Sequence, residues 1–335
     1  MTKVSRRHAL AIAGGSLLMA GRAFAMGGAV DESRFVSIGG IDQWIAIQGR
    51  DTRNPAILFL HGGPAEAQSP FLREFQPWEQ AFTVVNWDQR GSGKTYGRNG
   101  PFTPDLTLDR ITDDAIEVAE YVRRRLSKTK VILVGHSWGA ILGLHVIKRR
   151  PDLFAAFVGT GFAASWALSL RGQEGWARQQ AVAAGDQATL KALDDTAALP
   201  VTDWRRIIAS NKYKMSPSDL DYLKIQTAFI GPPPRPAAGD VANWIAGANF
   251  SGPKLISAIV SFDARALGLD MPVPFFVIQG RDDHVASFDP ARAYVEEVKA
   301  SIKAFIPIAG GHFACFTSPE EFVGALREQV RPLAR

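Results

Sequence analysis

The chain has 335 residues, of which 46% are hydrophobic and 21% are charged, with a formal net charge of +5 and one cysteine. This length and apolar content suffice for one large core with an inserted subdomain. The single cysteine, Cys315, excludes an intramolecular disulfide. We expect it to be a small buried core residue rather than a second nucleophile.

The first 25 residues have the pattern of an export signal. Ser5-Arg6-Arg7-His8 precedes a moderately apolar stretch, and Ala23-Phe24-Ala25 supplies a small-x-small cleavage site. The paired arginines predict passage through the twin-arginine export machinery, a periplasmic or secreted protein, and a mature chain that begins at or near Met26. The apolar stretch is too short and too glycine-rich to span a membrane. An uncleaved amphipathic N-terminal helix is the alternative interpretation.

Removing this segment changes the charge argument. It carries four basic residues and no acidic one, so 34 basic residues then face 33 acidic ones. Because the positive charge belongs largely to the signal, we expect no nucleic-acid partner and no anionic-membrane partner.

After the signal, predicted strands and helices alternate. The apolar runs predict eight strands, at 35–38, 43–48, 56–60, 82–86, 131–134, 156–159, 275–279 and 302–306. The first two alternate and favour an antiparallel hairpin, whereas the later continuous runs, the last of them included, favour buried strands of a parallel sheet covered on both faces. Helices are predicted at 108–126 and 319–330.

More than a hundred residues rich in Trp, Ala and polar groups separate the sixth and seventh predicted strands. The predicted fold class is therefore α/β, an eight-stranded, mostly parallel sheet with helices on both faces and an inserted, mainly helical lid. The expected division is 1–25 signal, 26–160 first part of the core, 161–268 lid and 269–335 second part of the core.

A serine stands at a sharp turn between the strand at 131–134 and an apolar-periodic stretch at 140–147. Strand, turn and helix in this order hold the serine in a strained backbone conformation. The neighbours at minus two and plus two must then be almost free of side chain, and Gly135 and Gly139 meet that need. We assign Ser137 as the nucleophile.

A serine hydroxyl needs a base, and the base needs an orienting group. The last two predicted strands end in Asp282-Asp283 and in Gly311-His312. The carboxyl ends of strands are where ligands bind in open α/β sheets. We assign His312 as general base, with His284 as the alternative base, and Asp283 as the residue that orients His312.

The strand at 56–60 runs into His61-Gly62-Gly63-Pro64, a turn that can aim backbone N–H groups at a developing oxyanion. We predict an oxyanion hole formed by the N–H groups of Gly63 and Trp138. The side chains of His136 and Trp138 are expected to pack around the turn rather than to act chemically.

Together these segments resemble the α/β-hydrolase-fold serine hydrolases of the proline iminopeptidase-like group. The matching blocks, in chain order, are His61-Gly62-Gly63-Pro64, Asp88-Gln89-Arg90-Gly91-Ser92-Gly93, Gly135-His136-Ser137-Trp138-Gly139, Gly280-Arg281-Asp282-Asp283 and Gly311-His312. In that family the catalytic aspartate stands three residues after the glycine of its block, which selects Asp283 over Asp282. The resemblance implies release of an N-terminal residue, commonly proline, from small peptides.

Two other enzyme classes are disfavoured by the sequence. Gly93-Lys94-Thr95 is not a phosphate-binding loop, because position 88 is aspartate rather than glycine and the stretch from Tyr96 to Pro101 is not expected to start a helix. The six histidines are scattered and form no metal-binding motif, so we expect neither a metal nor another cofactor. Asp88 and Arg90 are expected to pair and to shape a loop beside the site.

Substrate choice is left open between a small ester or amide and a short peptide. An exopeptidase must hold a protonated α-amine with a carboxylate, which the family supplies from a glutamate that follows a tryptophan in the lid. Here no lid tryptophan is followed by glutamate, and Glu174 is the only glutamate between Gly159 and Pro274. The lid aspartates Asp194, Asp195, Asp219 and Asp221 are expected on solvated helix faces. An aminopeptidase is therefore expected, with a lid-gated carboxylesterase or amidase as the alternative and a non-catalytic ligand-binding protein as a remote one.

Overall fold

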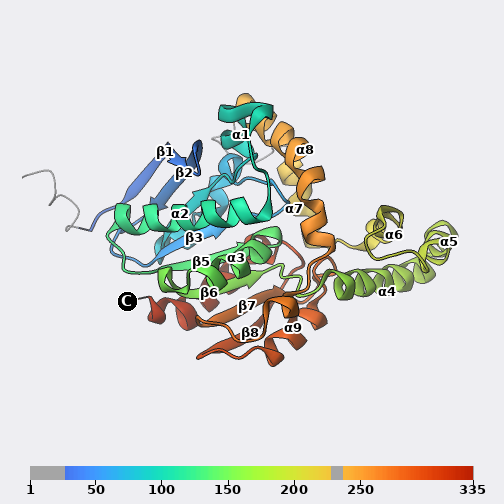
Figure 1. Cartoon of the computed structure of the whole chain (residues 1–335). Coiled ribbons are helices and arrows are strands. Elements are labelled where there is room, and N and C mark those ends of the chain that lie inside the picture. The colour runs from blue at the N-terminus through green and yellow to red at the C-terminus, as the bar shows by residue number, and fades with distance from the viewer. Residues whose placement is uncertain (1–26, 228–236, 335) are drawn as a thin grey trace, which may run out of the picture.

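A computed structural model describes residues 27–227 and 237–334, so the predicted signal lies outside the described residues. Within these ranges eight strands form one sheet in the order β1-β2-β4-β3-β5-β6-β7-β8 (Figure 1). The strands are β1 Val30–Ile38, β2 Ile41–Gly49, β3 Ala56–Leu60, β4 Thr83–Trp87, β5 Val131–His136, β6 Phe154–Thr160, β7 Phe275–Gly280 and β8 Lys303–Ile308. All eight predicted strands are confirmed, with ends that shift by a few residues.

The pairing of the strands also follows the prediction. β1 and β2 form an antiparallel hairpin, and β2 joins β4 antiparallel. Every later pair, from β4–β3 to β7–β8, is parallel. The carboxyl ends of β3, β5, β6, β7 and β8 therefore meet at one edge of the sheet, which is where the predicted site residues follow the strands.

Helices cover both faces of the sheet. Leu58 and Leu60 of β3 face one core, which includes apolar residues of α2 (Leu108–Leu126), α3 (Trp138–Arg149) and α9 (Phe288–Glu297). Ile57 and Phe59 face the other core, with α10 (Ala314–Thr317) and α11 (Pro319–Ala325). Because successive strand residues point to opposite faces, a continuous apolar run is what a sheet covered on both sides requires.

Two predicted elements differ in detail. The last strand, β8, was expected to be buried, but only Ile308 of its six residues is buried, because β8 is an edge strand with a neighbour on one side only. The predicted helix at 319–330 consists of α11 and a π-helical turn, Leu326–Val330. The predicted helix at 108–126 is confirmed at both ends, with Thr107 accepting the N–H of Arg110 as its N-cap.

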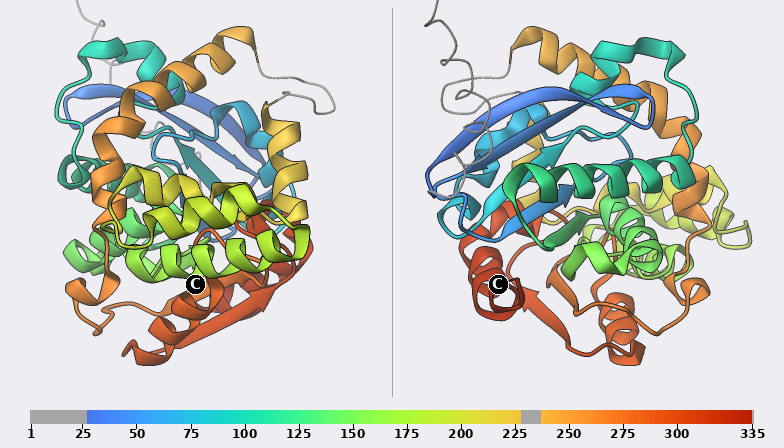
Figure 2. Two further views of the ribbon diagram at one scale, coloured as in Figure 1. Left: turned by 90° about the vertical axis from the view of Figure 1, so that its right-hand side faces the viewer. Right: turned by 60° about the vertical axis from the view of Figure 1, so that its left-hand side comes forward.

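Between β6 and β7 the chain forms a helical insertion. Its helices are α4 Trp166–Ala184, α5 Gln187–Thr196, α6 Trp204–Ala209, α7 Pro217–Thr227 and α8 Ala238–Val260. Figures 1 and 2 show α4, α5 and α6 standing out from the sheet, whereas α7 and α8 lie closer to it. The two ends of the insertion pair with each other, because Trp166 N donates to Phe262 O at 2.9 Å and Ala264 N donates to Ala164 O at 2.8 Å.

One expectation about the loop after β4 is wrong. A short helix, α1 (Gly93–Asn99), does form there, and Gly100 with φ +69° ends it before Pro101. The Asp88 carboxylate accepts the N–H of Lys94 at 2.7 Å and so supports the first turn of α1. The sequence argument against a phosphate-binding loop still rests on position 88, which is aspartate rather than glycine.

The expected pair of Asp88 and Arg90 is also wrong. Arg90 pairs instead with Asp114 of α2, at 2.7 Å, and both side chains are fully buried. The guanidinium also donates to Gly39 O at 2.8 Å and to Pro104 O at 3.1 Å. Arg90 therefore joins α2 to the loops on either side of it, and removing one partner of such a buried pair typically costs about 3–5 kcal/mol.

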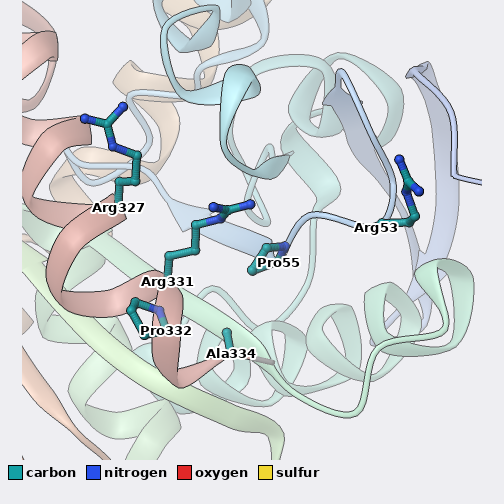
Figure 3. Close-up of a pocket in the computed structure, with 6 residues that line it drawn as sticks. All are labelled: Arg53, Pro55, Arg327, Arg331, Pro332 and Ala334. Carbon is teal, nitrogen blue, oxygen red and sulfur yellow. The ribbon is translucent and has the colours of Figure 1, made fainter.

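The opposite edge of the sheet, where the parallel strands begin, carries a small surface pocket lined by Arg53, Pro55, Arg327, Arg331, Pro332 and Ala334 (Figure 3). Two of its arginines have partners. Arg53 bonds Asp51, and Arg331 donates to Asn54 Oδ1. In the part of the chain that the structure describes, no helix is long and apolar enough to cross a membrane.

Candidate active site

Ser137 lies at the turn between β5 and α3, with φ 54° and ψ −119°. Few non-glycine residues adopt a positive φ, so this backbone is strained. Ser137 N donates to Thr160 O at 2.9 Å, and the side chain is partly exposed among buried neighbours. The structure thus presents the predicted nucleophile at the carboxyl end of β5.

The two glycines around the turn are required by close approach of the backbone. A Cβ on Gly135 would lie 2.3 Å from the carbonyl oxygen of Gly139, and a Cβ on Gly139 would lie 2.0 Å from the carbonyl oxygen of Leu60. Any side chain at either position would push α3 away from the sheet. The spacing of glycine around the serine therefore has the steric cause that the sequence predicted.

His312 and Asp283 meet at the same edge. His312 Nδ1 lies 3.2 Å from Asp283 Oδ2 and 3.3 Å from Oδ1, and both side chains are buried. Burial acts to raise the pKa of Asp283, but His312 and the hydrogen bonds to the carboxylate outweigh it and hold that pKa below its usual value. An ionised carboxylate can only accept, so Nδ1 carries the proton and Nε2 is left as the basic nitrogen.

Asp283 is held by a set of donors that the sequence did not indicate. Its Oδ1 accepts the N–H groups of Val285 at 3.0 Å and Ala286 at 2.8 Å, and its Oδ2 accepts Gln279 Nε2 at 2.7 Å. Gln279 in turn accepts the N–H of Phe162 at 2.9 Å. The carboxylate is thereby fixed toward His312, whereas Asp282 beside it is exposed.

His312 lies next to the serine turn through His136. The imidazole of His136 donates from Nε2 to His312 O at 3.0 Å, and the two rings lie 5.0 Å apart. Burial lowers the pKa of His136 to about 3, so this side chain is neutral and serves as a packed support. Ser137 Oγ and His312 Nε2 are not hydrogen-bonded within the described residues, as is common in unliganded sites.

The predicted oxyanion donors lie against this turn. A Cβ on Gly62 would lie 3.2 Å from Ser137 Cβ, so the 61–64 turn touches the nucleophile. Trp138 is the first residue of α3, and its N–H therefore has no acceptor within the helix. Among the described residues neither this N–H nor that of Gly63 donates a hydrogen bond, which leaves both for a bound oxyanion.

Gln89 joins the two segments that carry the predicted oxyanion donors. Its Oε1 accepts the indole N–H of Trp138 at 3.0 Å, and its Nε2 donates to His61 O at 3.1 Å. Its backbone N–H donates to His61 Nε2 at 3.2 Å. Burial lowers the pKa of His61 to about 4, which keeps that ring neutral as this bond requires. Gln89 belongs to the 88–93 block, but the sequence did not indicate this bridging role for its side chain.

Glu66 lies two residues after the 61–64 turn and carries a side-chain carboxylate. A Cβ on Gly63 would lie 3.1 Å from Glu66 Cγ, so the glutamate side chain curls over Gly63. The side chain is open to solvent. Desolvation by the surrounding protein nevertheless raises the pKa of its carboxyl, whereas the positive charges of His312 and Lys214 act to lower it. Within the described ranges its carboxylate has no hydrogen-bond or ion-pair partner.

Four acidic residues of the insertion form ion pairs with basic residues of the same insertion. Glu174 pairs with Arg206, Asp194 with Arg178, Asp195 with Lys191 and Asp221 with Lys224. Asp219 was expected on a solvated helix face, but its side chain is fully buried and accepts the N–H of His312 at 2.8 Å. This face of α7 is covered by residues that are distant in sequence. The expectation fails because periodicity along one helix does not reveal such contacts.

The two remaining candidate residues, His284 and Cys315, make packing contacts in the structure. His284, the alternative base, stacks on Trp176 with ring centroids 3.9 Å apart. Cys315 is fully buried, and burial raises the pKa of its thiol, as expected for a core residue rather than a nucleophile.

Comparison with known proteins agrees with this geometry. The family model for the alpha/beta hydrolase fold matches residues 55–319. A probable aminopeptidase of Bacillus subtilis is 28% identical over 314 residues, which cover 88% of this chain and 95% of that protein. A probable proline iminopeptidase of Streptomyces coelicolor is 34% identical over 116 residues, about a third of either chain.

Solved structures show the same fold. Proline iminopeptidase from Mycobacterium smegmatis superimposes with a TM-score of 0.62 at 20% identity, over 90% of this chain and 99% of that one. A proline iminopeptidase-related protein from Thermus thermophilus gives a TM-score of 0.61 at 20% identity, over 91% of this chain and 99% of that one. At this level of identity the likeness concerns the fold.

Proposed function

The chain belongs to the alpha/beta hydrolase family and is similar to its proline iminopeptidase-like members, and from this premise we propose that it is a serine aminopeptidase. It acts on short peptides through an acyl-enzyme on Ser137. Asp283 orients His312, and the N–H groups of Gly63 and Trp138 form the oxyanion hole.

The reaction proceeds in two acyl transfers. His312 Nε2 takes the proton of Ser137 Oγ as the oxygen attacks the scissile carbonyl carbon. The carbonyl oxygen becomes negatively charged and accepts hydrogen bonds from the N–H groups of Gly63 and Trp138. When the C–N bond breaks, His312 returns the proton to the leaving amine. Water then attacks the acyl-enzyme while His312 Nε2 takes a proton from it. As the bond between Ser137 Oγ and the acyl carbon breaks, His312 gives this proton to Oγ, and the N-terminal residue is released.

Glu66 is the observation that carries the choice of an aminopeptidase. A protonated α-amine that leaves water needs a negative partner close to the scissile bond. The Glu66 side chain curls over Gly63 of the 61–64 turn, and its carboxyl interacts electrostatically with His312 and Lys214. Among the described residues the carboxylate forms no hydrogen bond or ion pair, so it is open to a substrate amine. A simple ester substrate has no ammonium group for such a carboxylate to bind. The amine-binding group thus comes from the core of the protein rather than from the lid.

The test compares two chromogenic substrates, prolyl p-nitroanilide and p-nitrophenyl butyrate. We expect the free amine substrate to have the higher kcat/KM and N-acetylation to abolish its turnover. In Glu66→Gln, kcat/KM for the amine substrate should fall roughly 30-fold or more, while turnover of the ester stays within about threefold. Glu296→Gln, at an exposed position, is the matched control.

Turnover of the ester alone would refute the aminopeptidase and leave a lid-gated carboxylesterase or amidase. No turnover of either, with no covalent labelling of Ser137, would leave a non-catalytic ligand-binding protein.

We further propose that residues 1–25 direct the chain to the twin-arginine route and that the insertion between β6 and β7 acts as a lid over the site. The first proposal rests on the sequence alone, because these residues lie outside the described part of the chain.

A further inference from the structure

We propose that Asp219, at the start of α7, is a positioning residue that ties the helical insertion to the backbone of the catalytic base. This inference rests on the proposed role of His312. Its consequence is that the base is held in its working position only while α7 is seated against it.

The contact joins segments far apart in the chain. Asp219 Oδ2 accepts the N–H of His312 at 2.8 Å, and Oδ1 accepts the N–H of Phe313 at 2.9 Å. The carboxylate is fully buried. A bidentate, buried and charge-assisted pair of hydrogen bonds is among the stronger contacts that a backbone can make. It fixes the main chain at the residue that must present its imidazole to Ser137.

The same carboxylate also caps its own helix. Ser216 N donates to Asp219 Oδ2 at 3.3 Å, and Asp219 N donates to Ser216 Oγ at 3.2 Å. This reciprocal arrangement is a capping box, with Ser216 at the N-cap of α7 and Asp219 three residues later. Because one carboxylate serves both the helix start and the His312 segment, α7 cannot shift or rotate without releasing the backbone of the base.

The next turn of α7 also packs against the segment that follows His312. Tyr222, three residues after Asp219, lies with its ring 4.9 Å from Phe313 and stacks on Phe316 at 5.6 Å. Its hydroxyl donates to Glu74 at 2.5 Å. Residues at this spacing share one helix face. Asp219 is thus the polar end of a face of α7 that packs along the His312–Phe316 segment.

Gly311 supplies an independent sign of this contact. A Cβ on Gly311 would lie 2.0 Å from Asp219 Oδ2 and 2.4 Å from Ser216 Oγ. A side chain at position 311 would therefore displace the Asp219 carboxylate or the Ser216 hydroxyl, because both lie directly against Gly311. The close approach is built into both segments.

Asp219 also contributes to the electrostatics of the base. The charged and titratable groups that face His312 are Asp283 after β7, Glu66 on the oxyanion turn, His136 before the nucleophile and Asp219 in the insertion. Burial acts to lower the pKa of His312, but the three carboxylates outweigh it and raise that pKa. Neutralising Asp219 removes one of the three and lowers the pKa of the base.

The experiment compares Asp219→Asn with Asp221→Asn, a control on the same helix whose side chain is exposed. In Asp219→Asn we expect kcat to fall about 10- to 100-fold, while KM stays within about threefold of the parent value. A displaced base slows the chemical step but leaves substrate binding almost unchanged. The acid limb of kcat/KM should move to lower pH. Asp221→Asn should match the parent protein. Parent-like kcat and an unmoved acid limb in Asp219→Asn would overturn the proposal.

Two more variants separate this role from simple helix capping. Asp219→Glu keeps the charge and should leave the acid limb near its parental pH while kcat falls. Ser216→Ala removes the capping hydroxyl but keeps the carboxylate, and it should leave both kcat and the acid limb near those of the parent. A loss in Ser216→Ala as large as that in Asp219→Asn would show that capping alone accounts for the effect and would overturn the proposal.

NMR titration of the His312 imidazole separates this inference from the proposed function. It reports the pKa of the base without any turnover. A lower pKa in Asp219→Asn supports the coupling even if neither chromogenic substrate reacts, and an unchanged pKa contradicts it even if the aminopeptidase activity is found.

Discussion

The side-chain oxygen of Gln89 accepts the indole N–H of Trp138 at 3.0 Å. Through its amide nitrogen the same side chain donates to His61 O at 3.1 Å. Gln89 thereby holds together the two segments that supply the proposed oxyanion donors, one at the start of α3 and one after β3. Among the described residues neither donor N–H makes a hydrogen bond of its own, so we expect this bridge, together with the packing of α3 against the end of β3, to help set their separation.

Replacing Gln89 by leucine should therefore lower kcat on either chromogenic substrate by about tenfold or more, because misplaced oxyanion donors lose much of their effect. KM should change little. The measurement is steady-state kinetics together with a thermal melt. A parental kcat in a correctly folded Gln89→Leu protein would show that the bridge does not set the donors.

The catalytic assignment predicts graded losses at the base and its partner. His312→Ala should lower kcat roughly 10⁴-fold or more, and Asp283→Asn somewhat less, because the asparagine keeps the shape but loses the charge that stabilises the imidazolium. Single-turnover and steady-state rates with a melting profile provide the test. His312→Ala activity within tenfold of the parent would rule out this residue as the base.

Activity should rise with pH as His312 loses its proton. Burial acts to lower the pKa of His312, but the neighbouring carboxylates raise it above its ordinary value of about 6.5. Below that raised pKa the imidazole is protonated and cannot accept the Ser137 proton, so the acid limb should lie above about 6.5. A pH profile of kcat/KM from 5 to 9 measures it. A flat profile would argue against a histidine base.

The proposed twin-arginine route predicts that export requires Arg6 and Arg7 of the predicted signal. Changing Arg6 and Arg7 together to lysine preserves the charge but removes the feature that the route requires, so export should stop. Cell fractionation and N-terminal sequencing of the parent protein, expected to begin at or near Met26, check this. Full-length parent protein in the cytoplasm of a host with a working twin-arginine pathway would contradict the signal assignment.

The sheet and the positions of Ser137, Asp283 and His312 could be predicted because their signals are local. Continuous apolar runs mark the strands, and polar residues directly after them lie at one edge of a parallel sheet. Gly135 and Gly139 are explained by contacts within the turn and with the neighbouring strand, which the strand–turn–helix pattern already implies.

Contacts between distant segments could not be predicted in this way. Asp219 resembles a solvated helix residue until α7 is placed against His312, 93 residues later in the chain. The sequence offers Asp88 as the nearest acid for Arg90, although Asp114 is its partner in the fold. The proposed amine-binding carboxylate, Glu66, lies outside the lid, which is where the family resemblance places such a carboxylate. Its position two residues after Pro64 was the available signal.

Covalent labelling of Ser137 tests the central claim most directly. The parent protein is treated with a fluorophosphonate, and the modified residue is identified by mass spectrometry of the intact protein and its peptides. We predict one adduct on Ser137 that is absent from Ser137→Ala, a variant with the same melting profile. Labelling at another residue, or no labelling of an active parent protein, would contradict an acyl-enzyme on Ser137.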